Sequence, residues 1–423
     1  MQYKKTILNN GLRLITYAMP NMESASLGLW VRVGGRYEAR EIKGISHFLE
    51  HLAFKGSKNY SCRQIKESIE GVGGVINGFT SEESTCYYVK LPAARQLLAL
   101  DILVDMAVSP QLNQSDIEKE RFVILEEIKM YKDLPQSHVQ DMLDRLLWPE
   151  HPLGLPIIGQ RDTISKIKRE DLVFFQKRCY TPSNMVVAAC GKLKHEELLR
   201  ELKKASGKLE TDIKNIFIPA PSYEQKPRIK ILKKKTAQIH LALGFYGLYR
   251  DHPDKHIYSL LHVILGANMS SRLFNEVREK RGLAYQIGTQ VKGFTDTGIF
   301  LIHAGVDNNK LIKAIEVIVR ELDKIKKGSI TKAELVRAKE YYTGQIRLGL
   351  EDTLDHMFWI GEPTLHLNKT YSFPDILREV KKITPSDLRR IAKGIFKSQA
   401  SRLAVIGPFK KEEKRLYACI RDL

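Results

Sequence analysis

The sequence predicts an α+β protein of two homologous domains, each a mostly antiparallel sheet with helices packed on it. Three observations support this prediction. Segments typical of strands and of helices are interspersed without strict alternation, an internal repeat relates the two halves of the chain, and a stretch rich in lysine and proline lies between them. A length of 423 residues is enough for two or three domains with cores of their own.

Four stretches have the β-branched and aromatic content that is typical of strands. They are SLGLWVRVGG (26–35), TCYYVKL (85–91), MVVAAC (185–190) and IHLALGF (239–245).

Two helix starts are indicated by the spacing of a capping box. Ser61 precedes Gln64 by three residues, and Ser115 precedes Glu118 by three residues. The first of these helices is predicted to end at Gly71, because glycine commonly terminates a helix.

The repeat consists of two pairs of matching segments. Residues 165–193 align with 381–409 at a constant offset of 216, and INGFTSEE (76–83) aligns with VKGFTDTG (291–298) at an offset of 215. Because both pairs keep the same order at nearly the same offset, they indicate a duplicated domain of about 200 residues.

The segment between the halves loses hydrophobic periodicity around Pro219 to Pro227, which is typical of a linker. We therefore predict a first domain over 1–212, a linker over 213–230 and a second domain over 231–423.

Composition is that of a soluble globular protein, with 43% hydrophobic and 28% charged residues. The net charge of +19 is uneven, with 27 basic against 24 acidic residues in 1–200 and 41 against 25 in 201–423. Since the lysines are dispersed along helical stretches such as 320–342, they indicate solvated helix faces, and neither a nucleic acid nor a membrane is predicted as a partner.

The five cysteines are scattered and contain no C-x-x-C pair, so they are expected to be reduced thiols. No signal peptide or membrane-spanning segment is recognised, and we expect the protein to be cytoplasmic.

The stretch GISHFLEHLAFKG (44–56) places three polar residues in an apolar helix. His47 and His51 are one helical turn apart on one face, and Glu50 lies beside them. Two imidazoles so placed can bind one zinc ion, and an adjacent carboxylate can accept a proton from a water molecule. The H-x-x-E-H order is the signature of the inverted zincins, although two histidines can also decorate a helix without binding metal.

A catalytic zinc ion usually takes a third protein ligand. Glu120 and Glu127 are seven residues apart on one face of the helix predicted over 115–135, where they interrupt a stripe of apolar residues that includes Phe122. The neighbouring Glu118 and Glu126 are expected to pair with basic side chains on a solvated face.

With these residues in place, the chain resembles the pitrilysin or insulinase-type zinc metallopeptidases, and most closely their processing-peptidase-like subgroup. The family pattern is H-x-x-E-H followed by a glutamate 76 residues after the second histidine, which is the spacing of His51 and Glu127. The resemblance extends over nearly the whole chain, through VGGRYE (33–38), 73–91, 151–164, 180–191 and 270–287. One departure is Gly78, where relatives usually have alanine.

The resemblance implies a zinc metalloendopeptidase with one Zn²⁺ per chain, held by His47, His51 and Glu127. Glu50 is implied as general base and acid, and Glu120 as the outer-shell carboxylate that orients a histidine ligand.

The resemblance also implies how substrate is held. Residues Asn77, Gly78, Phe79 and Thr80 would form an edge strand to which an extended peptide or unfolded precursor segment is added. The alternative is an ordinary core strand. Arg278 and Tyr285 match the family's arginine and tyrosine, which would anchor the substrate backbone or stabilise the oxyanion.

The repeat and the family together imply an assembly. At the offset of 215, His47 aligns with His262, but Glu50 and His51 align with Leu265 and Gly266, so the second domain cannot form the same site. Longer relatives close four such domains around the substrate as a clamshell. Two domains are half of it, and a homodimer, or a heterodimer with a homologous subunit, is therefore expected.

Two other functions are open at this point. The family includes non-catalytic structural subunits, but these have eroded motifs, whereas the first-domain motif of this chain is intact. A nucleic-acid-binding protein would need the basic half to present a connected patch.

Overall fold

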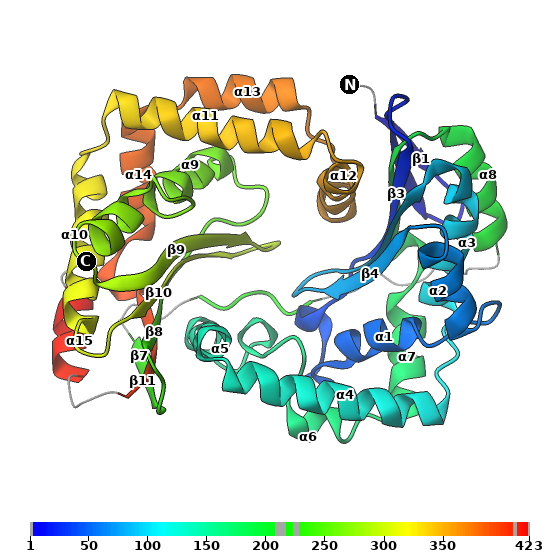
Figure 1. Ribbon diagram of the computed structural model, residues 1–423, viewed down its shortest axis with the longest axis horizontal. Coiled ribbons are helices and arrows are strands. Elements are labelled where there is room, and N and C mark those ends of the chain that lie inside the picture. The colour runs from blue at the N-terminus through cyan, green and yellow to red at the C-terminus, as the bar shows by residue number, and fades with distance from the viewer. Residues whose placement is uncertain (1–2, 208–216, 223–227, 409–412, 422–423) are drawn as a thin grey trace. The chain divides into compact units, whose positions relative to one another are not determined.

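The computed structural model describes residues 3–207, 217–222, 228–408 and 413–421 (Figure 1). The chain divides into two compact units. The first comprises Met1–Ile128, Pro156–Ile218 and Arg347–Ser372, and the second comprises Lys129–Leu155, Pro219–Ile346 and Phe373–Leu423. Each unit contains one sheet.

The sheet of the first unit has six strands with β4 at one edge. Its spatial order is β1 (Lys4–Ile7), β2 (Arg13–Ala18), β6 (Met185–Gly191), β3 (Ser24–Val31), β5 (Thr85–Pro92) and β4 (Val75–Thr80). All neighbouring pairs are antiparallel except β2 with β6. The apolar runs predicted as strands form the buried centre of this sheet, while β4 leaves one side unpaired.

Helices cover both faces of this sheet. A large core lies on one face, beneath helices that include α1 (Ile45–Ala53), α2 (Cys62–Glu70), α3 (Gln96–Val108), α7 (Arg169–Cys179) and α8 (His195–Ser206). The short α6 (Arg161–Ile164) belongs to the same unit, and α4 (Gln114–Asp133) begins in it and ends in the second unit. The other face is covered by α12 (Thr353–Leu367), which comes from late in the sequence.

The packing of α12 on the sheet is close. Met357 is fully buried, and a Cβ atom at Gly361 would lie 2.2 Å from Nε1 of Trp30. Only glycine therefore fits where this helix crosses the tryptophan.

The sheet of the second unit has five strands and ends at β9. Its order is β7 (Arg228–Lys233), β11 (Arg402–Gly407), β8 (Ile239–Tyr246), β10 (Gly298–Val306) and β9 (Ala284–Gly293), with β7 and β11 as the parallel pair. Its helices are α5 (Pro135–Leu147), α9 (Lys255–Leu265), α10 (Leu311–Lys327), α13 (Phe373–Lys382), α14 (Pro385–Ile395) and α15 (Glu413–Arg421). The long α11 (Lys332–Gly349) ends in the first unit.

The predicted fold class is confirmed, since both units are mostly antiparallel sheets with helices packed on them. The repeat is visible in the elements: α7 followed by β6 corresponds to α14 followed by β11, displaced by 216 residues for the helices and by 216 to 217 for the strands. The predicted strands are present as β3, β5, β6 and β8.

The two helix starts have different outcomes. Ser61 and Gln64 form the predicted capping box, and Gly71 ends α2. The capping box at Ser115 is wrong, because α4 already begins at Gln114 and Ser115 lies inside it. Phe122, expected in an apolar stripe of this helix, is 65% exposed on α4, whereas Ile124 and Ile128 of the same stripe are buried.

The compact units differ from the predicted ranges 1–212 and 231–423 in two segments, 129–155 and 347–372, which carry α5 and α12. Half of the predicted linker, 213–230, lies outside the described residues; 217–222 have no regular secondary structure, and 228–230 begin β7. In the described part of the chain, none of the helices combines the length and apolar character needed to cross a bilayer.

Candidate metal centre

Helix α1 carries the H-x-x-E-H motif on a firmly fixed backbone. Gly44, at φ +99°, turns the chain into the helix, and the carboxylate of Glu38 accepts hydrogen bonds from the backbone N–H groups of Gly44 and Ser46. This carboxylate satisfies donors that the first turn of a helix leaves unpaired. The apolar residues of α1 are buried in the core of the first unit, so the helix cannot rotate about its axis without exposing them.

The two histidines and Glu127 meet at one point. His47 and His51 lie one turn apart with ring centroids 4.6 Å from each other, and Glu127 reaches them from α4. One oxygen of Glu127, Oε2, lies 3.7 Å from Nε2 of His47 and 3.7 Å from Nε2 of His51. Within the described residues, these three form the only group of potential ligands close enough together for one metal ion.

These distances fit a shared metal ion better than hydrogen bonds. A separation of 3.7 Å is too long for a hydrogen bond, whereas zinc bonds of 2.0–2.2 Å at a tetrahedral angle place neighbouring ligand atoms about 3.4 Å apart. Burial, and then the nearby His51, lower the pKa of His47 to about 3, so its imidazole is neutral, as a metal ligand must be. Burial also raises the pKa of Glu127, which a bound cation would offset.

Glu120 contacts His51 rather than His47. Its Oε2 lies 3.0 Å from Nδ1 of His51, which leaves Nε2 of that ring directed at the ligand cluster. The other oxygen of Glu120 is 2.6 Å from Nζ of Lys55. Sequence reasoning did not identify Lys55, because it lies in the turn beyond the end of α1, where helical spacing no longer relates it to His51.

Glu50 lies between the histidines and β4. In the described part of the chain, the one hydrogen bond to its carboxylate comes from the Thr80 hydroxyl, which donates to Oε2 over 2.6 Å. Burial raises the pKa of Glu50, so the carboxylate binds a proton more readily than in water. A carboxylate in this state is suited to accepting a proton during catalysis.

Strand β4, beside α1 in Figure 1, has one edge available for pairing. The N–H of Gly78 donates to the side-chain oxygen of Asn77, an exposed interaction. Phe79 points to the opposite face of the sheet, where it contacts Trp30 and Phe358 of α12. The predicted substrate strand is therefore an edge strand, and the alternative of a core strand applies to its neighbour β5.

Arg278 and Tyr285 belong to the second unit. Arg278 lies in a short π-helix, Phe274–Glu279, and its guanidinium is 5.8 Å from the centre of the Tyr285 ring. Tyr285 is the second residue of β9 and is 75% exposed. The two side chains are thus neighbours, and the phenol of Tyr285 is accessible.

The second unit has a histidine in the corresponding helix but not the same cluster. His262 lies near the end of α9, which packs on β9 as α1 packs on β4, and its Nδ1 is 2.7 Å from the hydroxyl of Thr289. Leu265 is buried and Gly266 follows the last residue of α9. No second group of three potential ligands is found in the described ranges.

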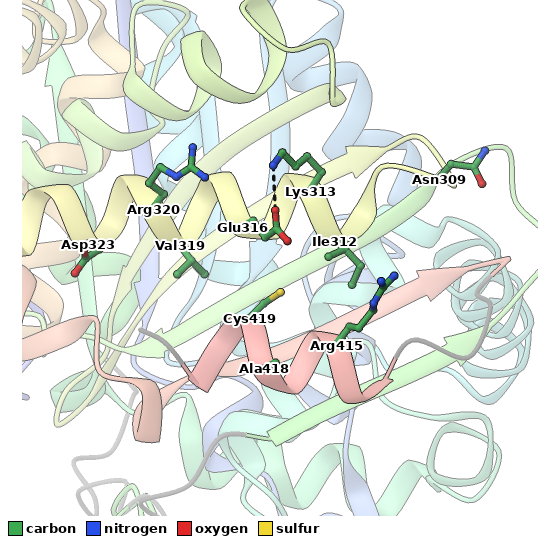
Figure 2. Close-up of a pocket in the computed structure, with 10 residues that line it drawn as sticks. All are labelled: Asn309, Ile312, Lys313, Glu316, Val319, Arg320, Asp323, Arg415, Ala418 and Cys419. Atoms are coloured by element: carbon green, nitrogen blue, oxygen red, sulfur yellow. Dashed lines mark hydrogen bonds and ion pairs between the residues drawn. The ribbon is translucent and has the colours of Figure 1, made fainter.

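A separate cavity of about 760 Å³ lies in the second unit between α10 and α15 (Figure 2). Basic and acidic side chains line it, among them Lys313, which pairs with Glu316, and Arg320, which lies one turn beyond. Because it contains none of the predicted site residues, this cavity is distinct from the metal centre.

Comparisons with known proteins show the family of this chain. Residues 13–161 match the family described as insulinase (peptidase family M16), and residues 166–342 match the family described as the peptidase M16 inactive domain. The chain is 35% identical to an uncharacterized zinc protease of Streptomyces coelicolor, over 99% of the chain and 92% of that protein, and 35% identical to another of Bacillus subtilis, over 96% and 98%.

Two solved structures have the same fold. A protease from Helicobacter pylori aligns with a TM-score of 0.91 and 26% identity, covering 96% of this chain and 100% of that one. A peptidase M16 inactive domain from Pseudomonas fluorescens aligns with a TM-score of 0.90 and 18% identity, covering 97% and 98%.

Proposed function

Since this chain belongs to the insulinase family of peptidases (peptidase family M16), we propose that it is a zinc metalloendopeptidase that hydrolyses peptides or unfolded segments of precursor proteins bound as an extended strand. The observation that carries the proposal is the convergence of His47, His51 and Glu127 beside Glu50. Relatives named zinc proteases support the choice of zinc.

When bound by the three ligands, zinc would polarise the scissile carbonyl and acidify a water molecule. Glu50 then accepts the proton of that water and transfers it to the departing amine, so that the carboxylate is regenerated in each cycle. Burial raises the pKa of Glu50, which supports this role because the carboxyl group can hold the transferred proton more readily than it would in water.

Glu120 orients one ligand. Its contact with Nδ1 of His51 favours the tautomer in which Nδ1 carries the proton and Nε2 is the metal-binding atom. Lys55 forms an ion pair with the other oxygen of this largely buried carboxylate.

The open edge of β4 is the proposed substrate site. A peptide that pairs with β4 through main-chain hydrogen bonds lies next to Glu50, and such pairing depends little on side-chain identity. For this pairing the N–H of Gly78 must exchange its hydrogen bond to the side chain of Asn77 for one to a peptide carbonyl. Because the present hydrogen bond is exposed to solvent, this exchange costs little free energy.

We also propose a dimer in which Arg278 and Tyr285 of one subunit serve the metal centre of the other, as anchors for the substrate backbone or donors to the oxyanion. The exposure of Tyr285 supports a role outside its own unit. Mixing the inactive variants Glu50→Gln and Tyr285→Phe should restore part of the activity. A monomer in sedimentation that cleaves peptides at full rate would refute the dimer.

The central test combines metal analysis with Glu50→Gln. We expect about one zinc ion per chain in both proteins, because Glu50 is not a ligand, and a loss of at least about 100-fold in peptide cleavage in the variant. Glu118→Gln is the matched control, since this glutamate pairs with Arg121 away from the cluster. Cleavage that survives Glu50→Gln would exclude the mechanism, and a wild-type protein that binds zinc without cleaving any peptide would favour a structural subunit.

A further inference from the structure

The catalytic carboxylate is held by the same strand that is proposed to receive substrate. Thr80 is the last residue of β4, and its hydroxyl donates a 2.6 Å hydrogen bond to Oε2 of Glu50. In the described part of the chain this is the only hydrogen bond that Glu50 receives. Without it, rotation about the side-chain bonds of Glu50 is limited only by packing.

The packing is also provided by β4. Residues 78 and 80 lie on the same face of the strand because side chains alternate. A Cβ atom at Gly78 would lie 3.3 Å from Cγ of Glu50, so the backbone of Gly78 closely borders the stem of this side chain. Strand β4 therefore contacts Glu50 twice, once at its methylene groups and once at its carboxylate.

The position of Thr80 is itself well determined. It pairs with Thr85 across the hairpin, and the turn between them is closed by hydrogen bonds between Ser81 and Ser84. Thr85 is fully buried and donates to the carbonyl of Val33 on the neighbouring segment. The hydroxyl of Thr80 thus belongs to a rigid corner of the sheet rather than to a loose strand end.

We propose that Thr80 is a positioning residue for the peptidase reaction, whose hydroxyl holds one oxygen of Glu50 so that the other oxygen faces the water to be deprotonated. The inference rests on the proposed function of Glu50 as general base. It assigns the Thr80 side chain a role separate from the main-chain pairing of β4 with substrate.

The test compares Thr80→Val, which keeps the shape and removes the hydroxyl, with Thr80→Ser, which keeps the hydroxyl. Cleavage of an internally quenched peptide gives kcat and KM, and zinc content is measured on the same samples. For Thr80→Val we expect kcat to fall about 10-fold to 100-fold, because a misplaced catalytic group costs this much, with KM within about twofold. Thr80→Ser should recover kcat to within about threefold of wild type.

Thr16→Val is the matched control, since it removes a buried hydroxyl of the same sheet, which bonds to Nδ1 of His195, without touching Glu50 or β4. It should lower the unfolding temperature and leave kcat unchanged. An unchanged kcat in Thr80→Val, an equal change in Thr16→Val, failure of serine to restore activity, or a change in KM alone would each overturn the role of Thr80.

Glu50→Gln assayed in parallel separates the two ideas. If wild type is active, Glu50→Gln is inactive and Thr80→Val equals wild type, only the inference about Thr80 fails. If Glu50→Gln is as active as wild type, the proposed function of Glu50 fails and the inference fails with it.

Discussion

Replacing Glu120 by glutamine should weaken zinc binding through His51. The carboxylate of Glu120 accepts from Nδ1 of His51 on one side and contacts Nζ of Lys55 on the other. A glutamine has a single oxygen, so one of these two donors must face its NH₂ group. We therefore expect Glu120→Gln to lose either the orientation of His51 or the contact with Lys55.

The size of the effect follows from this geometry. The side chain of Glu120 is only 7% exposed, so water cannot replace the lost acceptor. Loss of an outer-shell carboxylate typically reduces metal affinity 10-fold to 100-fold, or about 1.4–2.7 kcal/mol. Lys55→Met should have a smaller effect, about threefold, because Lys55 is 35% exposed and solvent screens its charge.

The double variant distinguishes this explanation from general damage to the helix. In Glu120→Gln with Lys55→Met, the glutamine oxygen can turn to His51 without placing its NH₂ group against an ammonium group. The double variant should therefore bind zinc more tightly than Glu120→Gln alone, which is a non-additive result. The assay is competition for zinc with a chelator of known affinity.

Equal zinc affinity in wild type and Glu120→Gln would refute the orienting role. Strictly additive losses in the double variant would refute the coupling through Lys55.

Two further predictions concern the fold around the site. Gly361→Ala should lower the free energy of unfolding in urea by about 2 kcal/mol, because its Cβ atom would lie 2.2 Å from Nε1 of Trp30. The matched helical variant Gly344→Ala, whose Cβ atom would have nothing within 4 Å, should be neutral or slightly stabilising. Equal effects of the two variants would contradict the close packing of α12. Burial, followed by the nearby His303, lowers the pKa of His262 from 6.5 to about 4. On acidification this histidine is therefore protonated in the unfolded chain before it is protonated in the folded one. Up to about 3 kcal/mol of stability should be lost as the pH falls from about 6.5 to about 4. His262→Gln should reduce that loss in thermal unfolding scans at the two pH values, and an unchanged loss would exclude His262 as its source.

The sequence was sufficient for the parts of the site that depend on local spacing. The one-turn separation of His47 and His51 follows from helical geometry, because residues four apart share a face. The apolar residues around them indicate a helix packed against the core, and the repeat predicted two similar domains. The interval of 76 residues to Glu127 was informative only through the family resemblance.

Contacts between distant segments depended on the tertiary structure. Which histidine Glu120 contacts, the pairing of Glu120 with Lys55, and the hydrogen bond from Thr80 to Glu50 each join side chains from separate elements. No periodic pattern encodes such pairs, because their distances depend on how the helices pack on the sheet.

The helices α5 and α12 show the same division most clearly. Nothing local to their sequences states that α12 covers the sheet of the first unit or that α5 covers the sheet of the second. That choice depends on matching shapes, such as Gly361 against Trp30 and Leu143 against Gly244. The sequence by itself determined the duplication, the metal-binding motif and several of the strands. The tertiary structure decided which segments complete each core and which side chains contact His51 and Glu50, because close packing between distant residues is a property of the folded chain.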